Sequence, residues 1–220
     1  VQGTHCCIIG ESREAASPRR YRLCYSISLN EIVNESDHKG FVTTALDVVH
    51  SWAMFRLLRR TIRGPRGDVF VRTYVSTPGA VGVIAITPEN DIVLVSQYRS
   101  SFDDYVLEIP AGMRDVEGED PSRTAWRELA EETGYVPKTV EYLGSCLSSP
   151  GVTDSVLELF IARDVLVGGS APEGPEELEM TVLVIPFSEA LAMVDDGKIT
   201  DAKSSVGILL AARRFDDLGV

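Results

Sequence analysis

The 220-residue sequence has little cysteine and no long apolar run. Its four cysteines are Cys6, Cys7, Cys24 and Cys146, and none of their spacings is the CxxC of a zinc site. A metal cluster of His5 with the three N-terminal cysteines is conceivable, but free thiols in a reducing compartment are the favoured interpretation. No stretch reaches the roughly 18 to 20 apolar residues of a membrane span, and no basic-then-apolar signal segment opens the sequence. We therefore expect a cytoplasmic protein that does not bind membranes.

Basic residues are also scarce relative to acidic ones. The chain has 21 Lys and Arg against 33 Asp and Glu, a net charge of −12. Residues 1–72 carry 11 basic and 7 acidic residues, whereas residues 73–220 carry 10 basic and 26 acidic ones. A protein that grips nucleic acid by its phosphates needs clustered Lys and Arg. The acidic body therefore argues against a nucleic-acid partner, and it permits a site that collects divalent cations.

The length and composition fit one substantial globular domain. Hydrophobic residues make up 44% and charged residues 25%, which excludes a disordered or fibrous chain. At this size folding buries roughly 70% of the unfolded surface, so no disulfide or metal is needed to complete a core. Residues 1–45 show no sustained period and are interpreted as an N-terminal extension of unknown role. We expect N-terminal strands over 46–78 and the main domain over 79–220.

Strand-like patterns begin near residue 52. Residues 55–62 and 69–76 flank the turn GPRG at 64–67, which predicts a hairpin. A second hairpin is predicted from two apolar runs closed by the turn PEND at 88–91. The second hairpin comprises 80–87 and 92–98, and further strands are expected at 105–109, 140–147, 156–162 and 181–185.

Helical signals are few and clear. Asp120 is an N-cap residue followed by Pro121, and Gly134 stands just past the expected end. They predict a helix over 121–133. Two more helices are expected over 188–195 and 204–215. Strands outnumber helices and their order is mixed, so the fold class is α+β.

The first of these helices carries an unusual number of carboxylates, in the sequence RELAEETG at 127–134. Glu128 and Glu132 are four residues apart and share one face, with Glu131 beside them. Like charges at this spacing, near the helix C-terminus, are unfavourable. A solvated acidic face is the commonest explanation. The alternative is a bound cation, because three oxygen donors suit Mg²⁺ or Mn²⁺.

The sequence upstream supports the second interpretation. LEIPAG at 107–112 ends a strand and leads through MRDVEGE at 113–119 into the helix. This strand–loop–helix resembles the Nudix box of nucleoside-diphosphate hydrolases, and 127–134 match it position by position, eight residues after Glu119. Two positions differ: Tyr135 replaces the final aliphatic residue, and six rather than five residues separate Gly112 from Glu119.

The resemblance implies a Nudix fold, with a mixed β-sheet sandwiched between helices (α/β/α) and an N-terminal β-hairpin extension. It implies that Glu128 and Glu132 bind metal directly, that Glu131 reaches an ion directly or through water, and that the Ala111 carbonyl completes the set. Mg²⁺ is the expected cofactor, with Mn²⁺ as the alternative.

Other box residues are expected to be structural. The resemblance makes Glu119 and Arg127 an ion pair that holds the loop against the helix. Ala125, Trp126 and Leu129 are most simply the side of the helix that faces the core.

Features outside the box resemble the ADP-ribose pyrophosphatase branch over about residues 50–215. Pro150 follows Gly134 by 16 residues, within SSPGVTD at 148–154. PGAV at 78–81, QYR at 97–99, the acidic segment 173–179 and GKITDAKS at 197–204 also resemble the branch. The implied reaction is hydrolysis of ADP-ribose to AMP and ribose 5-phosphate. Alternatives are another nucleotide sugar such as ADP-glucose, a dinucleotide, or a non-catalytic nucleotide-sugar sensor.

The branch implies a general base from the acidic segment. Glu176 is the first candidate, Glu177 the second and Glu173 the third, and they would act together with the catalytic metal ligand Glu132. The simpler interpretation of a Gly, Pro and Glu-rich segment is a solvated surface loop.

Substrate-binding residues are also implied. Arg99 is expected to contact a phosphate, although it could be a plain charge at a strand end. Arg72 could reach a substrate across a homodimer, because members of the branch pair through N-terminal strands. Gly112, Met113 and Ser149 complete the set.

An adenine pocket is expected near the N-terminal strands. Trp52 and Phe55 are candidates for its walls, although core packing is the favoured role for both.

Overall fold

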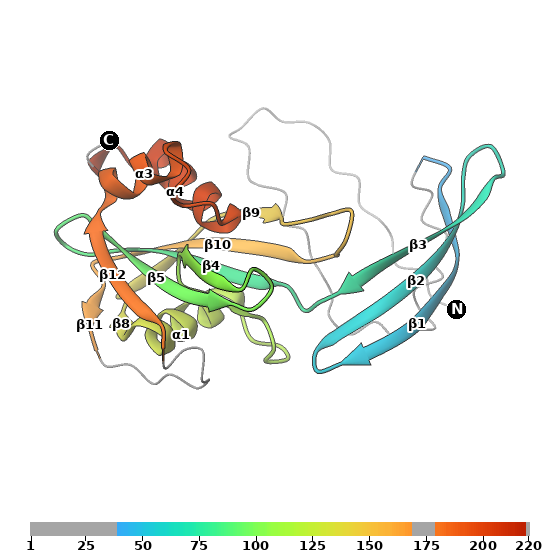
Figure 1. Ribbon diagram of the computed structural model, residues 1–220, viewed down its shortest axis with the longest axis horizontal. Coiled ribbons are helices and arrows are strands. Elements are labelled where there is room, and N and C mark those ends of the chain that lie inside the picture. Colours follow the sequence, from blue (N-terminus) through green and yellow to red (C-terminus); the bar gives the residue numbers. More distant parts are fainter. Residues whose placement is uncertain (1–38, 169–178, 219–220) are drawn as a thin grey trace, which may run out of the picture.

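The computed structural model describes residues 39–168 and 179–218. Within these ranges no helix combines the length and apolar character needed to cross a bilayer. The chain forms a body of strands and helices, from which a small separate sheet extends to one side (Figure 1).

The extending part is an antiparallel sheet in the order β1-β2-β3, here called the N-terminal sheet. Its strands are β1 (Val42–Trp52), β2 (Phe55–Arg63) and β3 (Val69–Ser76). The β2–β3 hairpin confirms the sequence prediction, whereas β1 was not expected. Two register shifts interrupt its pairing with β2, and they break the alternation that a strand normally shows.

The body is built on a mixed seven-stranded sheet. Its main path runs β12-β5-β4-β10-β9, with β6 on β5 and β7 on β4. The β10–β4 pair is parallel and the other pairs are antiparallel. The strands are β4 (Ala80–Ile86), β5 (Asp91–Arg99), β6 (Asp104–Glu108), β7 (Ala111–Met113), β9 (Thr139–Leu147), β10 (Val156–Arg163) and β12 (Thr181–Pro186); the short β8 (Tyr135–Val136) and β11 (Leu166–Val167) pair separately.

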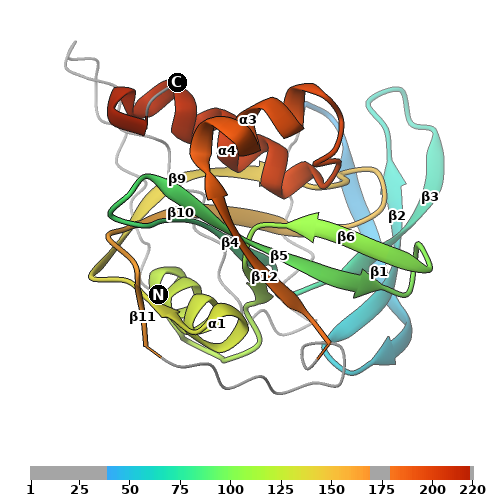
Figure 2. The ribbon, with the colours of Figure 1, turned by 60° about the vertical axis from the view of Figure 1, so that its left-hand side comes forward.

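Helices cover both faces of this sheet (Figure 2). Helix α1 (Pro121–Thr133) lies on one face, and α3 (Phe187–Asp195) and α4 (Ala202–Arg214) lie on the other, followed by a 3₁₀ turn at Asp216–Leu218. All three helices were predicted within two residues at each end. The architecture confirms the α+β class and the α/β/α sandwich.

Alternation along the strands divides the core into two layers. On β4, Ile84 and Ile86 face the layer that contains α3 and α4, whereas Val81 and Val83 face the layer that contains Leu129 of α1. The side of α1 opposite this core is left to face the loop that follows β7.

The N-terminal sheet joins the body at the loop after β9. The Val75 amide donates to the Val152 carbonyl at 2.8 Å, and the Asp154 amide donates to the Val75 carbonyl at 3.3 Å. The Asp154 carboxylate also accepts a hydrogen bond from the Thr77 amide at 3.0 Å. These contacts connect the sheet to the same loop that contains Ser149.

Candidate active site

Helix α1 is fixed at both ends by its sequence. The Asp120 side chain accepts a hydrogen bond from the Ser122 amide at 2.9 Å, and Gly134 ends the helix in the left-handed region at a φ of 73°. Ala125 and Leu129 are fully buried against the sheet, as predicted. The prediction for Trp126 was wrong: it is 38% exposed, because its indole N–H reaches out to the Pro137 carbonyl at 3.3 Å.

Arg127 lies at the centre of the carboxylates. Its guanidinium contacts Glu131 at 2.9 Å, Glu128 at 3.0 Å, Glu119 at 3.4 Å and Asp115 at 3.5 Å. The Glu119 contact confirms the predicted ion pair between loop and helix. Burial opposes the charge on Arg127, but Glu128 and Glu131 outweigh it and raise the pKa of the guanidinium. Arg127 therefore offsets the repulsion between the clustered carboxylates.

Two glutamates of α1 reach β7. A Cβ atom placed on Gly112 would lie 1.9 Å from the carboxyl carbon of Glu128, so the carboxylate rests directly on this glycine. Glu132 is only 8% exposed, and its carboxylate accepts a hydrogen bond from the Ala111 amide at 2.9 Å. The structure thus brings Glu128 and Glu132, which the helix register places on one face, to the same short strand.

The charge on Glu128 is poorly compensated. Burial raises the pKa of its carboxyl to about 7, although the charge of Arg127 acts in the opposite direction and Glu131 adds to the increase. Within residues 39–168 and 179–218, no three acidic, His or Cys side chains are grouped so that they could hold a metal ion as they stand. The reason is that Arg127 holds Glu128 and Glu131, while the Ala111 amide holds Glu132.

The donors nevertheless suit a hard divalent cation. All of them are oxygen atoms, the ligand type that Mg²⁺ and Mn²⁺ prefer. The partly buried Glu128 carboxylate, seated on a backbone that has no side chain at Gly112, is a position where a cation would be electrostatically favoured.

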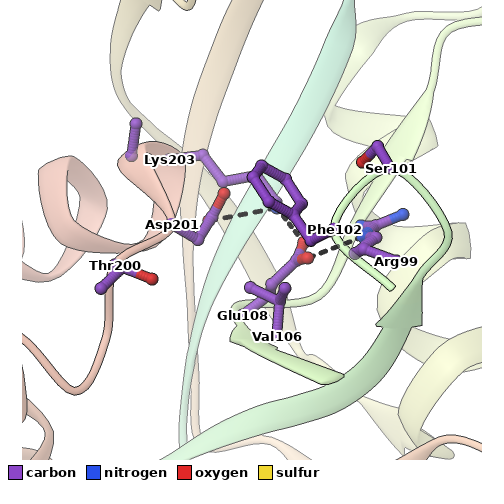
Figure 3. A pocket seen from close by; sticks show the side chains of 9 residues that line it. Arg99, Ser101, Phe102, Val106, Glu108, Thr200, Asp201 and Lys203 are labelled. Carbon is purple, nitrogen blue, oxygen red and sulfur yellow. Dashed lines mark hydrogen bonds and ion pairs between the residues drawn. The ribbon is translucent and has the colours of Figure 1, made fainter. Parts of the chain in front are cut away.

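A second charged cluster lies where β5 and β6 end. Arg99 forms two hydrogen bonds of 2.7 Å to the two oxygens of Glu108, and Lys203 binds one of the same oxygens (Figure 3). Burial would raise the pKa of Glu108, but Arg99 and Lys203 more than reverse this effect and lower it. Arg99 is therefore part of an ordered cluster, not an isolated charge on the surface.

The cluster lines a cleft of about 500 Å³. Phe102, from the β5–β6 turn, stands on one side of the cleft, and Thr200 and Asp201, from the start of α4, stand on the other (Figure 3). Glu132 contributes to the electrostatic field at Arg99. Of the α1 carboxylates, Glu132 is therefore near enough to act electrostatically on Arg99 at the cleft.

The remaining predicted residues are more dispersed. Met113 ends β7 and is half-buried. Ser149 is exposed in the turn after β9, where its carbonyl accepts the amides of Val152 and Thr153. Arg72 lies on the N-terminal sheet, with its guanidinium 4.8 Å above the Phe70 ring.

Glu173, Glu176 and Glu177, the candidates for the general base, lie outside the described residues.

Trp52 and Phe55 stack on each other with ring centroids 5.7 Å apart. Trp52 is 43% exposed, so the expectation that it packs in the core was wrong. It belongs to a sheet that has almost no core of its own.

Sequence reasoning missed Glu108, Lys203 and Ser204. Glu108 did carry a signal, because it is a charged residue between the apolar Leu107 and Ile109 at the end of a strand. Lys203 and Ser204 lie in a stretch that was noted for its resemblance, but no local pattern indicated what they contact.

Together, the fold and the site define a class: a hydrolase with an acidic strand–loop–helix on a mixed sheet that is covered by helices on both faces. Comparison with known proteins identifies the family. The NUDIX domain model matches residues 76–205. The chain is 36% identical over 166 residues to the methanol dehydrogenase activator of Bacillus methanolicus, and 34% identical over 166 residues to the ADP-ribose pyrophosphatase of Bacillus subtilis. Each alignment covers 76% of this chain and 89% of the relative.

The crystal structure of ADP compounds hydrolase has the same fold, with a TM-score of 0.72 at 19% identity. The alignment covers 82% of this chain and 96% of that one. The chain belongs to the Nudix family, and its resemblance to the ADP-ribose pyrophosphatase branch is confirmed. It is a Nudix hydrolase of the diphosphatase type.

Proposed function

We propose that the protein is a Mg²⁺-dependent pyrophosphatase that hydrolyses ADP-ribose to AMP and ribose 5-phosphate. The observation that carries this proposal is the placement of Glu128 and Glu132 of α1 against Gly112 and Ala111 of β7. The similarity to an ADP-ribose pyrophosphatase supports the choice of substrate. Mn²⁺ is the alternative cation.

Glu128, Glu131, Glu132 and the Ala111 carbonyl would hold the metal. When bound, Mg²⁺ neutralises diphosphate charge and acidifies a water molecule, so an acidic site can accept an anionic substrate. Gly112 leaves the room that the Glu128 carboxylate occupies. Arg127 keeps the carboxylates together on one side of the helix.

The chemical step is attack of a water oxygen on a phosphorus of the diphosphate. The bond from that phosphorus to the bridging oxygen breaks, which gives AMP and ribose 5-phosphate. The proton of the water passes to a carboxylate of the acidic segment, with Glu176 proposed first, Glu177 second and Glu173 third.

Arg99 is proposed to bind a phosphate of the substrate. Two of its nitrogens are held by Glu108, and its side chain is still 38% exposed toward the cleft. An oriented guanidinium suits phosphate oxygens better than an ammonium group does. Gly112, Met113 and Ser149 would complete the binding surface within the body.

The N-terminal sheet is proposed to form a homodimer, with Arg72 reaching the partner's substrate. Apolar side chains on its strands are exposed to solvent, among them Val49 at 50% and Val69 at 63%. Exposed apolar side chains are stabilised by contact with another surface. Residues 46–78 would then serve dimerisation, residues 79–220 catalysis, and residues 1–45 remain an extension without an assigned role. Cys146, a free thiol, supports a cytoplasmic location.

A second candidate is the same reaction on another nucleotide sugar, such as ADP-glucose, or on a dinucleotide. It is favoured by the similarity to a GDP-mannose pyrophosphatase of Yersinia enterocolitica, which is 32% identical over 135 residues and is named for another nucleotide sugar. A panel of these compounds, compared by kcat/KM with Mg²⁺ present, distinguishes the candidates. We expect ADP-ribose to have the highest kcat/KM. If another compound had the highest value, that compound would replace ADP-ribose as the proposed substrate. Binding without turnover of any compound would support a non-catalytic sensor instead.

A further inference from the structure

The first turn of α4 is fastened to the strand segment that leads into the active site. Asp201 caps the helix by accepting hydrogen bonds from the amide and the hydroxyl of Ser204. The same Ser204 hydroxyl accepts a buried hydrogen bond from the Ile109 amide at 2.8 Å. Ile109 stands two residues before Ala111, so the start of α4 and the site strand share one rigid connection.

Lys203 adds a charged contact to this connection. Its ammonium group binds a carboxylate oxygen of Glu108 and lies 3.1 Å from the Asp201 carboxylate. The side chain is only 15% exposed, and that of Glu108 is 4% exposed. Because Lys203 is largely covered and directed at two carboxylates, its role in binding any ligand would be indirect.

Lys203 and Arg99 are connected through the Glu108 carboxylate. The Nη2 atom of Arg99 and the ammonium group of Lys203 bind the same oxygen of Glu108, and the Nε atom of Arg99 binds the other oxygen (Figure 3). The cluster of Arg99, Lys203, Glu108 and Asp201 contains two cations and two carboxylates. Without Lys203 it would carry a net negative charge beside the place where a diphosphate is to bind.

We propose that Lys203 is a positioning residue: by sharing the Glu108 carboxylate with Arg99, it holds the Arg99 guanidinium at the cleft for the substrate's phosphates. This inference rests on the proposed function, in which Arg99 contacts a phosphate. It extends the active site to the start of α4, on the opposite face of the sheet from α1.

Loss of Lys203 should weaken substrate binding through Arg99. In Lys203→Gln, Arg99 is the only cation among residues 39–168 and 179–218 that still contacts Glu108, so the guanidinium is drawn toward the carboxylate and the local charge becomes negative. A hydrogen bond to a charged group has an energy that corresponds to about tenfold in affinity. We expect KM for ADP-ribose to rise about tenfold, with a smaller change in kcat, and Lys203→Arg to restore KM to near its original value.

A double-mutant cycle tests whether Lys203 affects KM through Arg99. Lys203→Gln is combined with Arg99→Gln, and KM for ADP-ribose is measured for all four proteins at 20 °C with Mg²⁺ in excess. If Lys203 acts through Arg99, Lys203→Gln changes KM by less than about twofold when Arg99 is already replaced. An equal increase in both backgrounds would overturn the proposal.

A second measurement does not depend on turnover. The Nε–H proton of Arg99 is hydrogen-bonded to Glu108, so its side-chain NMR resonance reports the position of the guanidinium. The resonance should shift in Lys203→Gln and return in Lys203→Arg. An Arg99 resonance that is unchanged in Lys203→Gln would contradict the proposal. If the unmodified protein does not hydrolyse ADP-ribose, the proposed function fails, and this resonance still decides the role of Lys203.

Lys198→Gln is the matched control. Lys198 lies in the turn before α4, is 64% exposed and pairs with Asp196 at 3.6 Å. The substitution removes the same charge from the same region without touching Glu108. It should change KM by less than about twofold, because exposed ion pairs contribute little, and a tenfold change would show that overall charge, not position, is responsible.

Discussion

The N-terminal sheet and the body differ most in where their apolar side chains lie. Among the described residues of the N-terminal sheet, Leu58 is the only buried apolar side chain, whereas the body has a buried layer on each face of its own sheet. Strands pair with their neighbours through backbone hydrogen bonds in both regions. The comparison teaches that pairing defines the shape of the N-terminal sheet, while burial stabilises the body.

This difference assigns separate roles to the two regions. The residues proposed to bind metal and the Arg99 cluster all lie in the body, on elements anchored by a core. The N-terminal sheet contributes Arg72 and exposed apolar residues. The body should therefore determine the chemistry and the stability of the chain, and the sheet should determine its assembly.

The largest expected effect concerns chemistry in the body. Glu132→Gln preserves an acceptor for the Ala111 amide but removes a charge from the proposed metal site. We expect kcat for ADP-ribose with Mg²⁺ to fall by about 10² to 10³, the range found when a key stabilising group is removed from an active site. Glu141→Gln, an exposed change on β9, is the control and should retain full activity. Full turnover by Glu132→Gln would contradict the assignment of the site.

The next effect contrasts the two regions in stability. Leu129→Ala leaves a cavity in the fully buried layer beneath α1 and should lower the free energy of unfolding by about 3 kcal/mol. Val49→Ala, in the N-terminal sheet, should lower it by less than about 0.5 kcal/mol in a monomer, because Val49 is half exposed. Urea unfolding at low protein concentration measures both changes. Equal decreases in the free energy of unfolding would contradict the claim that burial stabilises the body more than the N-terminal sheet.

A smaller effect concerns assembly. Val49→Asp places a charge on the exposed face of the N-terminal sheet and should weaken the proposed dimer by about 2 kcal/mol, the scale of an interface hot spot. Val167→Asp is the control: Val167 is 77% exposed but lies on β11 of the body. Sedimentation equilibrium should show dissociation only for the first variant. A monomeric unmodified protein would exclude this role of the sheet.

The smallest effect concerns one turn in each region. Gly134 ends α1 at a φ of 73°, and Ala53 joins β1 to β2 at a φ of 44°. Glycine adopts this region freely, whereas a Cβ atom costs about 1 kcal/mol. Gly134→Ala should therefore lower the thermal midpoint, while Ala53→Gly should leave it unchanged or raise it slightly. A higher thermal midpoint for Gly134→Ala, or a lower one for Ala53→Gly, would show that the positive φ angle does not determine the stability of these turns.

The sequence predicted the elements whose residues carry their own signals. The cap Asp120 and the terminal Gly134 defined α1 to the residue, and two apolar runs closed by a turn located β4 and β5. Strand β1 was missed because its side chains are largely exposed and its pairing contains two register shifts, so its apolar residues do not alternate. The two- and three-residue strands β7, β8 and β11 are too short to show any period.

The sequence predicted the part of the site that lies on α1 and in the loop before it. The spacing of Glu128, Glu131 and Glu132 placed them on one face, and the pair of Glu119 and Arg127 was expected. The contact of Lys203 with Glu108 joins residues 95 positions apart, and only the packing of α4 on the sheet brings them together. No local pattern encodes such a contact.

The central claim is that the acidic site of the body cleaves a diphosphate with the help of a divalent cation. The most direct test is the release of inorganic phosphate from ADP-ribose by the protein coupled to alkaline phosphatase, which acts on AMP and ribose 5-phosphate. Each ADP-ribose cleaved should yield two phosphates with Mg²⁺ or Mn²⁺ added, and none above background when the protein is freed of divalent cations beforehand and none is added; no chelator is present, because it would inactivate the alkaline phosphatase. Equal release with and without the cations, or no release with them, would contradict the account.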